Sequence, residues 1–402
     1  MITGEPVAVP CTFTRGVEQR MNLQPTEEQK MVRDMIARFV DEEIKPVAAE
    51  LDRTHRHPQE LCRTLGTMGL MGVAVPEAYG GAGMDNVTYV MALIEISRGC
   101  ASCGVIVSVN NSLYGYPLNA FGTDEQKKRF LAPVAGGEVE GCYALTEADA
   151  GSDAAALRCR AELKGDRYIV NGTKKFITSG NVARYCVLAA TEDPAKGYKG
   201  ILNLIVDLDN TPGFSLGTVE EKMGITASGT AELIFEDAEI PAENLLGRPG
   251  EGFRQMMMGL DAGRIGIGAQ ACGIGRSVLE DSLGYAQERV QFGRSISSFQ
   301  AIQWKLADMA TELDAAELLL LRAAWLEDQG HDFEKEAAMA KMYASDVAMK
   351  AAVEGVQIFG GYGYCADYPA ERHMRDAKIC QIYEGTNEIQ RVVIARKLLG
   401  MR

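Results

Sequence analysis

Hydrophobic residues recur at helical spacing along the first part of the chain. Thr26 stands before two glutamates, which is typical of a helix start because the hydroxyl caps free backbone N–H groups and acids favour the first turn. The hydrophobic residues that fall on one face of this helix are Met31, Met35, Ile36, Phe39 and Val40. Glycines and a proline interrupt the pattern over 66–83, and helical segments resume over 87–97 and 123–131. The pattern therefore predicts a helical N-terminal domain over residues 21–140.

Short β-rich runs replace the helical pattern near residue 141. Residues 167–178 read RYIVNGTKKFIT, and we expect two strands joined at Asn171-Gly172, since Asn-Gly is a strong hairpin signal. Three further apolar runs bounded by turn residues are 187–190, 201–207 and 231–235. These runs predict a small β domain over residues 141–250.

The helical period returns after Pro249-Gly250 and continues to the end of the chain. Four segments are long enough for a helix bundle, namely 251–290, 299–329, 333–359 and 388–399. A C-terminal helical domain over 251–402 follows, so the fold class is α+β with the order helices, β, helices. Residues 1–20 contain Glu5 and Glu18 and no long apolar core, which argues against a secretory or transit signal and predicts a disordered extension.

Composition excludes several classes of protein. The 402 residues are 47% hydrophobic and 24% charged, as in ordinary globular proteins, and the length predicts roughly two or three domains. The formal net charge of −14 would repel a phosphate backbone, so we expect no nucleic-acid partner. No apolar stretch approaches the ~20 residues that cross a bilayer, so we expect no membrane span.

The cysteines and histidines show no metal-binding pattern. Ten cysteines are scattered, several in apolar runs, which favours free thiols in a reducing compartment. Cys100 and Cys103 have CxxC spacing, but no second pair or nearby histidine completes a metal set, and packing in a helix explains them better. His55 and His57 lie in an Arg-rich polar stretch that predicts solvent exposure. We therefore expect no metal site.

Residues 266–271 have the Gly-x-Gly-x-x-Ala spacing of dinucleotide-binding folds. That fingerprint requires a strand before the glycines, whereas the surrounding residues here have a helical pattern. Small residues that let two helices approach closely are the better explanation. No Gly-x-Ser-x-Gly or P-loop string occurs, so serine hydrolase and nucleoside triphosphatase functions have no support.

The segment 382–391 reads IYEGTNEIQR. Thr386 can cap a following helix with Glu388 in its first turn, so a helix start explains the segment without any site. Glu384 precedes the cap, between Tyr383 and Gly385, where a loop can direct a carboxylate into a cleft. These residues alone leave both interpretations open.

Three blocks of sequence, in this order and at this spacing, resemble the acyl-CoA dehydrogenase family. They read GCYALTEADAGSD at 141–153, NGTKKFIT at 171–178, and QIFGGYGY at 357–364 followed by PAER at 369–372 and by the segment 382–391. The similarity covers almost everything from Met21 onward and is greatest to the short-chain, butyryl-CoA dehydrogenase type. It implies an N-terminal helical domain, a middle β-barrel or sandwich domain and a C-terminal four-helix bundle.

The resemblance implies FAD as the cofactor and assigns residues to its site. Those expected against the flavin ring are Tyr143, Leu145, Thr146, Phe176, Ile177 and Thr178. The family often has Trp at the position of Phe176, so the stacking surface is smaller here. The adenine dinucleotide part is assigned to Arg289, Phe292 and Gln300, with Gln357, Gly360 and Gly361 contributed by a neighbouring subunit. Thr386 and Glu388 complete the FAD site.

The same resemblance assigns the substrate side. Ser152, in the flavin-facing block, is expected to hold the CoA part, and Asp261 with Arg264 matches a substrate-side pair. The Gly385 backbone is expected to touch the acyl chain, and Glu384 matches the catalytic base. A buried apolar setting would raise the pKa of Glu384 and strengthen it as a base. Its backbone N–H and a flavin ribityl hydroxyl would stabilise the enolate oxygen while hydride passes to flavin N5.

The implied reaction is oxidation of a short-chain acyl-CoA to trans-2-enoyl-CoA, with electrons passed to an electron-transfer flavoprotein. A dicarboxylic, cyclic or aryl-substituted acyl-CoA is the alternative substrate. Ser102 stands where glutaryl-type relatives have an arginine that binds the distal carboxylate. This difference makes a dicarboxylic substrate less favoured and does not bear on cyclic or aryl substrates. An acyl-CoA oxidase is less favoured because oxidases are longer chains, and a non-catalytic acyl-CoA-binding scaffold because Glu384 is present. The family also implies a homo-oligomer, a tetramer, in the bacterial cytoplasm or the mitochondrial matrix.

Overall fold

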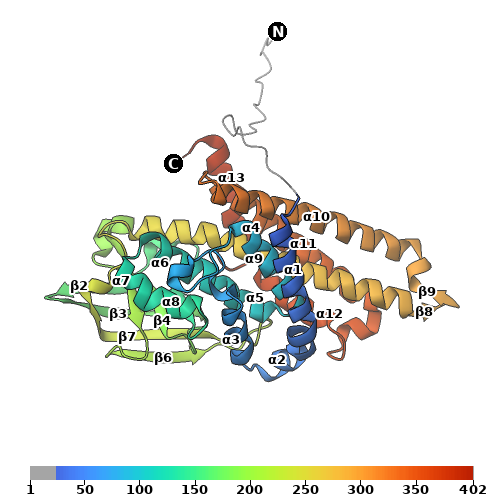
Figure 1. The fold of residues 1–402 in the computed structure, drawn as a ribbon, viewed down its shortest axis with the longest axis horizontal. Helices are drawn as coiled ribbons and strands as arrows, with labels where there is room; N and C mark the ends of the chain where they lie inside the picture. The colour runs from blue at the N-terminus through green and yellow to red at the C-terminus, as the bar shows by residue number, and fades with distance from the viewer. Residues whose placement is uncertain (1–23, 402) are drawn as a thin grey trace, which may run out of the picture.

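The computed structural model describes residues 24–401 and arranges them as helices, a curled sheet and further helices in one elongated molecule (Figure 1). This order confirms the predicted α+β fold. The extension expected over 1–20 lies outside the described residues.

The part before the sheet consists of helices joined by short turns. Its α-helices are α1 (Glu27–Phe39), α2 (Ala48–Thr54), α3 (Gln59–Thr67), α4 (Asn86–Gly99), α5 (Ala101–Ser108), α6 (Tyr116–Phe121), α7 (Asp124–Gln126) and α8 (Ala132–Ala135). The π and 3-10 segments between them are η1 (Val40–Ile44), η2 (Lys45–Val47), η3 (Leu70–Gly72), η4 (Glu77–Tyr79), η5 (Val109–Gly115) and η6 (Lys127–Leu131).

Local chemistry determines where these helices begin. Thr26 caps α1 as predicted: its Oγ1 accepts a hydrogen bond from Gln29 N at 3.1 Å, and Gln29 Oε1 accepts one from Thr26 N at 3.0 Å. Asp85 caps α4 in the same way, with 2.7 Å from Thr88 N to its carboxylate. Every residue of α5 is buried, so this helix runs through the interior of the molecule.

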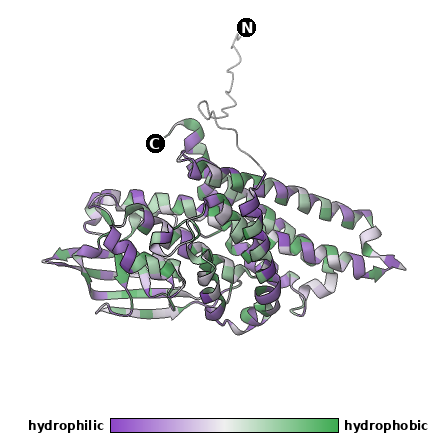
Figure 2. Ribbon diagram, in the orientation of Figure 1, coloured by the Kyte–Doolittle hydropathy of each residue, from purple (hydrophilic) through white to green (hydrophobic). Residues whose placement is uncertain are grey.

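The middle part is a seven-stranded sheet. Its strands are β1 (Gly141–Ala144), β2 (Arg160–Lys164), β3 (Arg167–Thr178), β4 (Tyr185–Thr191), β5 (Ile201–Asp207), β6 (Phe214–Val219) and β7 (Thr230–Pro241), with 3-10 turns η7 (Ala154–Ala156), η8 (Pro194–Gly200) and η9 (Ala242–Asn244). The strand order is β1-β4-β2-β3-β7-β6, and β5 pairs with β4. Hydrophobic and hydrophilic residues alternate along several strands in Figure 2, as expected for a sheet with one face on a core.

The hairpin predicted at Asn171-Gly172 is wrong. Both residues lie within the single strand β3, and the turn comes earlier, where Lys164 pairs with Arg167. The pairing of β3 with β7 shifts register between Val170 and Gly172, which makes Asn-Gly a bulge. Glycine is required there because a Cβ on Gly172 would lie 2.7 Å from Cys159 Cα.

The part after the sheet is again helical. Its helices are α9 (Gly252–Glu288), α10 (Gln300–Asp328), α11 (Glu334–Phe359), α12 (Ala370–Ile379) and α13 (Asn387–Leu399); between them lie β8 (Val290–Gln291), β9 (Arg294–Ser295), η10 (Ile296–Ser298) and η11 (Gly360–Tyr364). The pattern analysis located four of these helices and missed α12. The glycine string at 266–271 lies inside α9, as predicted, and a Cβ on Gly268 would lie 2.5 Å from Leu320 of α10.

Polar contacts join the three parts. Ile225, between β6 and β7, donates its N–H to Asp376 of α12 at 2.6 Å. Arg375, one residue earlier, donates to Asp52 of α2 at 2.7 Å. No helix among residues 24–401 combines the length and the hydropathy that a membrane crossing requires.

Candidate active site

Glu384 lies in a tight loop between α12 and α13. Its φ is 52°, in the left-handed region that a non-glycine residue rarely adopts, and Gly385 follows with φ 92°. Thr386 caps α13, accepting a hydrogen bond from Ile389 N at 3.3 Å, so the predicted helix start is confirmed. Such backbone strain persists only where surrounding contacts enforce it.

Contacts from neighbouring helices hold this loop. Lys341 of α11 donates to Gly385 O at 2.8 Å, and Gln390 of α13 donates to the same oxygen at 2.8 Å. Tyr383 donates its hydroxyl hydrogen to Gln270 of α9. The loop is therefore held by three helices.

The carboxylate of Glu384 packs against the backbone of α9. A Cβ on Gly263 would lie 2.1 Å from Glu384 Oε2, so only glycine leaves room for the side chain. Oε2 is buried and has no hydrogen-bond partner among the described residues. Burial raises the pKa of Glu384 to about 8, although the positive charges of Lys341 and Arg264 act in the opposite direction. A carboxylate in this state is a stronger base than one in water.

Two cations and a second carboxylate surround Glu384. Lys341 is fully buried, and burial lowers its pKa to about 8. Arg264 forms an ion pair with Asp261, one turn earlier on α9. Burial raises the pKa of Asp261 to about 7, with Arg264 opposing the shift. The structure thus brings together the pair that the sequence assigned to the substrate side; its role there stays a prediction.

Two hydroxyl groups lie one turn along α9 from Glu384. A Cβ on Gly266 would lie 2.4 Å from Ser108 Oγ and 2.6 Å from the hydroxyl of Tyr89. Tyr89 donates to Ser108 at 3.4 Å, and both side chains are buried. These two hydroxyl groups therefore face α9 about one helical turn from the glycine that contacts Glu384.

The block assigned to the flavin lies at the end of β1. Lys174 of β3 is fully buried and donates to Leu145 O at 2.9 Å and to Glu147 at 2.7 Å. The N–H of Lys175 donates to Thr146 O at 2.8 Å. These bonds hold residues 145–147 against β3. The hydroxyl of Tyr143 is buried and has no partner among the described residues.

The other residues assigned to the flavin lie on β3. Phe176 has φ 58° and is 62% exposed, at a register shift between β3 and β7. Ile177 is buried beside it, and Thr178 ends the strand. Ser152, assigned to CoA, is exposed in the loop between β1 and β2.

A separate group of assigned residues lies at the opposite end of the molecule. They surround β8, β9 and η11 at the tip formed by α9, α10 and α11 (Figure 1) and are Arg289, Phe292, Gln300, Gln357, Gly360 and Gly361. Phe292 is 94% exposed, and the guanidinium of Arg289 lies 5.4 Å from the ring centre of Tyr362. The structure does not bring this group to Glu384 within one chain.

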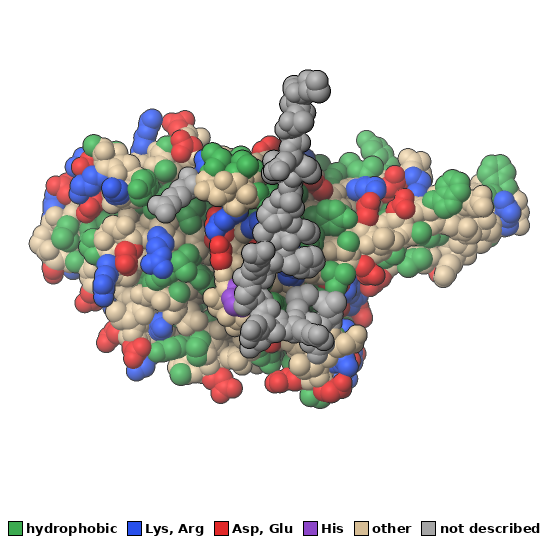
Figure 3. Space-filling view, turned by 90° about the horizontal axis from the view of Figure 1, so that it is seen from above, with side chains coloured by type: hydrophobic (Ala, Val, Ile, Leu, Met, Phe, Trp, Pro, Cys, Tyr) green, Lys and Arg blue, Asp and Glu red, His purple; other side chains and the backbone are tan. Residues whose placement is uncertain are grey.

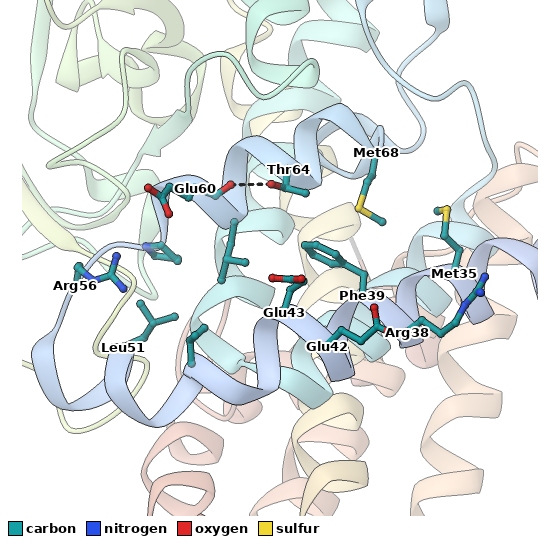
Figure 4. A pocket seen from close by; sticks show the side chains of 13 residues that line it. Met35, Arg38, Phe39, Glu42, Glu43, Leu51, Arg56, Glu60, Thr64 and Met68 are labelled. Carbon is teal, nitrogen blue, oxygen red and sulfur yellow. Dashed lines mark hydrogen bonds between the residues drawn. The ribbon is translucent and has the colours of Figure 1, made fainter.

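A groove on the described part of the chain lies away from these residues. It runs between α1 and α3, with Met35 and Phe39 on one side and Thr64 and Met68 on the other (Figure 4). Neither Glu384 nor any other assigned site residue lines it. We therefore locate the candidate active site by its chemistry and packing.

Sequence analysis missed three residues that shape the site, namely Tyr89, Gly263 and Lys341. All three are far from Glu384 in the sequence, so no local sequence pattern predicts that they lie beside it. The string Leu-Asp-Ala-Gly-Arg at 260–264 pointed to Asp261 and Arg264 as substrate-side residues. Gly263 stands between them, and this position is the one signal that could have indicated its role.

Three family models together match almost the whole described chain. The acyl-CoA dehydrogenase N-terminal domain matches residues 26–138, the middle domain 142–238 and the C-terminal domain 250–399. The chain belongs to the acyl-CoA dehydrogenase family.

Individual relatives agree with this membership. The short-chain specific acyl-CoA dehydrogenase of Clostridium acetobutylicum is 47% identical over 94% of this chain and all of the relative. The butyryl-CoA dehydrogenase structure from Megasphaera elsdenii is 43% identical over 94% of this chain and all of that chain, with a TM-score of 0.92. A chain in a structure described as electron transferring flavoprotein of Acidaminococcus fermentans is 49% identical over 94% of this chain and all of that chain, with a TM-score of 0.93.

The pKa of Glu384 gives a pH dependence for any step in which this residue accepts a proton. Its carboxylate form predominates only above about pH 8, so we expect kcat/KM for an acyl-CoA to rise with pH and to level off above that value. Steady-state rates across a pH series with an artificial electron acceptor measure this. A kcat/KM that falls over the same range would show that the protonated form of the site is the active one.

Proposed function

We propose that this chain is a FAD-dependent dehydrogenase that oxidises a short-chain acyl-CoA to its trans-2-enoyl-CoA and passes the electrons to an electron-transfer flavoprotein. The observation that carries the proposal is the buried, unpartnered carboxylate of Glu384, held in a strained loop against Gly263. Similarity to the short-chain and butyryl-CoA dehydrogenases, and to a chain in an electron-transferring flavoprotein structure, supports the substrate and the acceptor.

Glu384 is the base in this proposal. The α-proton of a thioester is very weakly acidic, so its removal requires a base that water does not stabilise. Oε2 of Glu384 has no competing donor among the described residues, and its pKa of about 8 brings the carboxylate close to working pH. The backbone N–H of Glu384 is the proposed donor to the thioester oxygen as negative charge develops there.

The residues assigned to FAD suit a flavin dinucleotide. Tyr143 offers a buried hydroxyl without a partner, and Phe176 offers an exposed ring held in place by a left-handed backbone. Lys174 and Lys175 hold the loop that presents Leu145 and Thr146. Bound FAD would supply the two-electron acceptor that the protein side chains lack.

The packing near Glu384 favours a short acyl group. Tyr89 and Ser108 lie beside Gly266, three residues along α9 from the glycine that contacts Glu384. That spacing is about 4.5 Å along the helix, which leaves little length for methylene groups beyond the reacting carbons. Ser102, buried in α5, offers no cation for a distal carboxylate.

The position of the second group of FAD residues favours a homo-oligomer, a tetramer. Gly263 and the end of α9 are separated by roughly 25 residues, or about 38 Å, so the tip lies too far from Glu384 for one flavin to contact both in the same chain. The tip also exposes Phe292, Tyr364 and Val290, and hydrophobic side chains are visible on this projecting end in Figure 3. The tip of one subunit would therefore bind the FAD of another.

Two neighbouring glutamates test the assignment of the base. In Glu384→Gln, FAD content should be retained and acyl-CoA should still bind, while anaerobic flavin bleaching should slow by at least ~100-fold because the general base is lost. Glu388→Gln is the comparison variant, since Glu388 is exposed in the first turn of α13 and is assigned to FAD: it should lower FAD content at most, and the flavin that stays bound should bleach without the ~100-fold loss. Near wild-type bleaching by Glu384→Gln would falsify the mechanism.

A series of acyl-CoAs tests the substrate. Butyryl-CoA should bleach the flavin faster than a ~12-carbon thioester, because Tyr89 and Ser108 close the pocket. A long pocket would instead reward each methylene by about 0.8 kcal/mol, seen as a steady rise in kcat/KM with chain length. Tyr89→Leu should move the preference toward longer acyl groups; the same preference in wild type and variant would refute the role given to Tyr89.

Substitutions at the tip test the assembly. Phe292→Ser should lower FAD content and weaken the oligomer, because Phe292 is 94% exposed in one chain and would be covered by another subunit. Leu163→Ser, at an exposed hydrophobic residue of β2, is the control and should leave both unchanged. Light scattering and released FAD report the result, and an active wild-type monomer at assay concentration would contradict the shared site.

A further inference from the structure

Three side chains that can ligate a metal meet where α3 lies against the segment leading into β1. They are His57, Cys62 and Glu140, and one ligand atom from each lies within 4.8 Å of the others. His57 Nε2 and Glu140 Oε1 are 2.5 Å apart. None of the three belongs to the candidate active site. The solvent exposure predicted for His57 is wrong: its side chain is only 14% exposed, because Glu140, 83 residues later in the chain, packs against it.

Close backbone packing creates this meeting point. A Cβ on Gly66 of α3 would lie 2.4 Å from Gly137 Cα, so two glycines allow the helix to touch the segment that leads to Glu140. Glu140 is held in turn at the start of β4, because its carbonyl oxygen accepts a hydrogen bond from the N–H of Arg184, the residue before that strand, at 3.0 Å. The ligand positions are therefore set by rigid backbone on both sides.

Polar atoms in the cluster lack partners. Glu140 is 8% exposed, and its Oε2 has no hydrogen-bond partner among the described residues. The Nδ1 of His57 is also buried without a partner. Cys62 is 3% exposed. Buried polar atoms are almost always satisfied in folded proteins, so Glu140 Oε2 and His57 Nδ1 leave a further ligand to be accounted for beside the contact between His57 Nε2 and Glu140 Oε1.

We propose that His57, Cys62 and Glu140 form a binding site for a divalent zinc ion. Imidazole nitrogen, thiolate sulfur and carboxylate oxygen are the three ligand types of protein zinc sites, with bonds of roughly 2.0–2.3 Å. Ligand atoms at those distances from one tetrahedral ion lie about 3–4 Å from each other. His57 Nε2 and Glu140 Oε1, 2.5 Å apart without the ion, would move apart to that separation when zinc binds between them. A sulfur and a nitrogen ligand disfavour magnesium and calcium, which prefer oxygen.

Charge balances when zinc binds. The ion brings two positive charges, and Glu140 brings one negative charge. Cys62 releases its thiol proton to solvent and becomes the second negative ligand. His57 binds as the neutral imidazole, and water occupies the fourth position. Bound zinc would give Glu140 Oε2 the partner that it lacks among the described side chains.

Zinc at this site would tie two distant segments together. It would join α3 of the N-terminal helical part to the start of β1, and so stabilise the folded state relative to the unfolded chain, which has no preformed site. The position lies outside the catalytic residues, so the expected effect is on stability.

Metal content tests the proposal on the intact flavin-loaded protein. The protein is first stripped with a chelator and then dialysed against Zn²⁺. In competition with a chromophoric chelator, the wild type should then retain one zinc per chain. Cys62→Ser and Glu140→Gln should each weaken Zn²⁺ binding by at least about tenfold. Substitution with Co²⁺ should give tetrahedral d–d absorption at wavelengths beyond the oxidised flavin, and Cys62→Ser should abolish it.

Two control variants separate this site from chance binding. Cys365→Ser removes an exposed thiol elsewhere, and His55→Asn removes an exposed neighbouring histidine at a left-handed position that Asn tolerates. Both should retain zinc and show the same rise in unfolding temperature on adding Zn²⁺ as the wild type. If Glu140→Gln fails to fold, His57→Asn, at a less buried position, takes its place in the Zn²⁺-binding measurement and should show the same loss of affinity. Absence of zinc from the wild type, or equal zinc in all folded variants, overturns the proposal.

Discussion

One buried carboxylate without a hydrogen-bond partner constrains much of this structure. The packing that denies Glu384 a partner also excludes water, so the pKa of the carboxylate rises and the charged form becomes a reactive base. Holding that group requires Gly263 on α9, where any side chain would collide with it, and a left-handed backbone at Glu384 itself. Lys341 supplies a hydrogen bond to the loop from a fully buried position and so carries its own pKa shift. Reactivity and strain at this site have the same physical origin.

Helix α9 connects the chemistry to the assembly. Its glycines accept Glu384, Tyr89 and Ser108 near one end, and its other end projects to the exposed tip with Phe292. A straight helix of 37 residues cannot bring both ends to one small molecule. The same length that places the tip beyond its own active site allows it to reach the site of a neighbour. The proposed oligomer is in this sense a consequence of helix geometry.

Glu140 presents the same problem of a buried carboxylate in a different setting. Around Glu384 the missing partner leaves room for a substrate proton. Around Glu140 the neighbours are His57 and Cys62, whose ligand atoms converge on one point. Each of these two carboxylates has one oxygen without a partner among the described residues, and the two lead to different inferences because the groups that face them differ.

The sequence by itself determined features that depend on neighbouring residues. The caps at Thr26 and Thr386, the positions of the long helices and the order of helices, sheet and helices follow from local patterns, and the family blocks pointed to Glu384. The tertiary structure decided what depends on distant partners. Asn171-Gly172 forms a bulge because β7 pairs beside it, and His57 is largely shielded from solvent because Glu140 packs against it. The shifted pKa of Glu384 requires Gly263, far earlier in the chain. Burial belongs to a packed neighbourhood, and a local sequence pattern carries little information about which distant residues will form it.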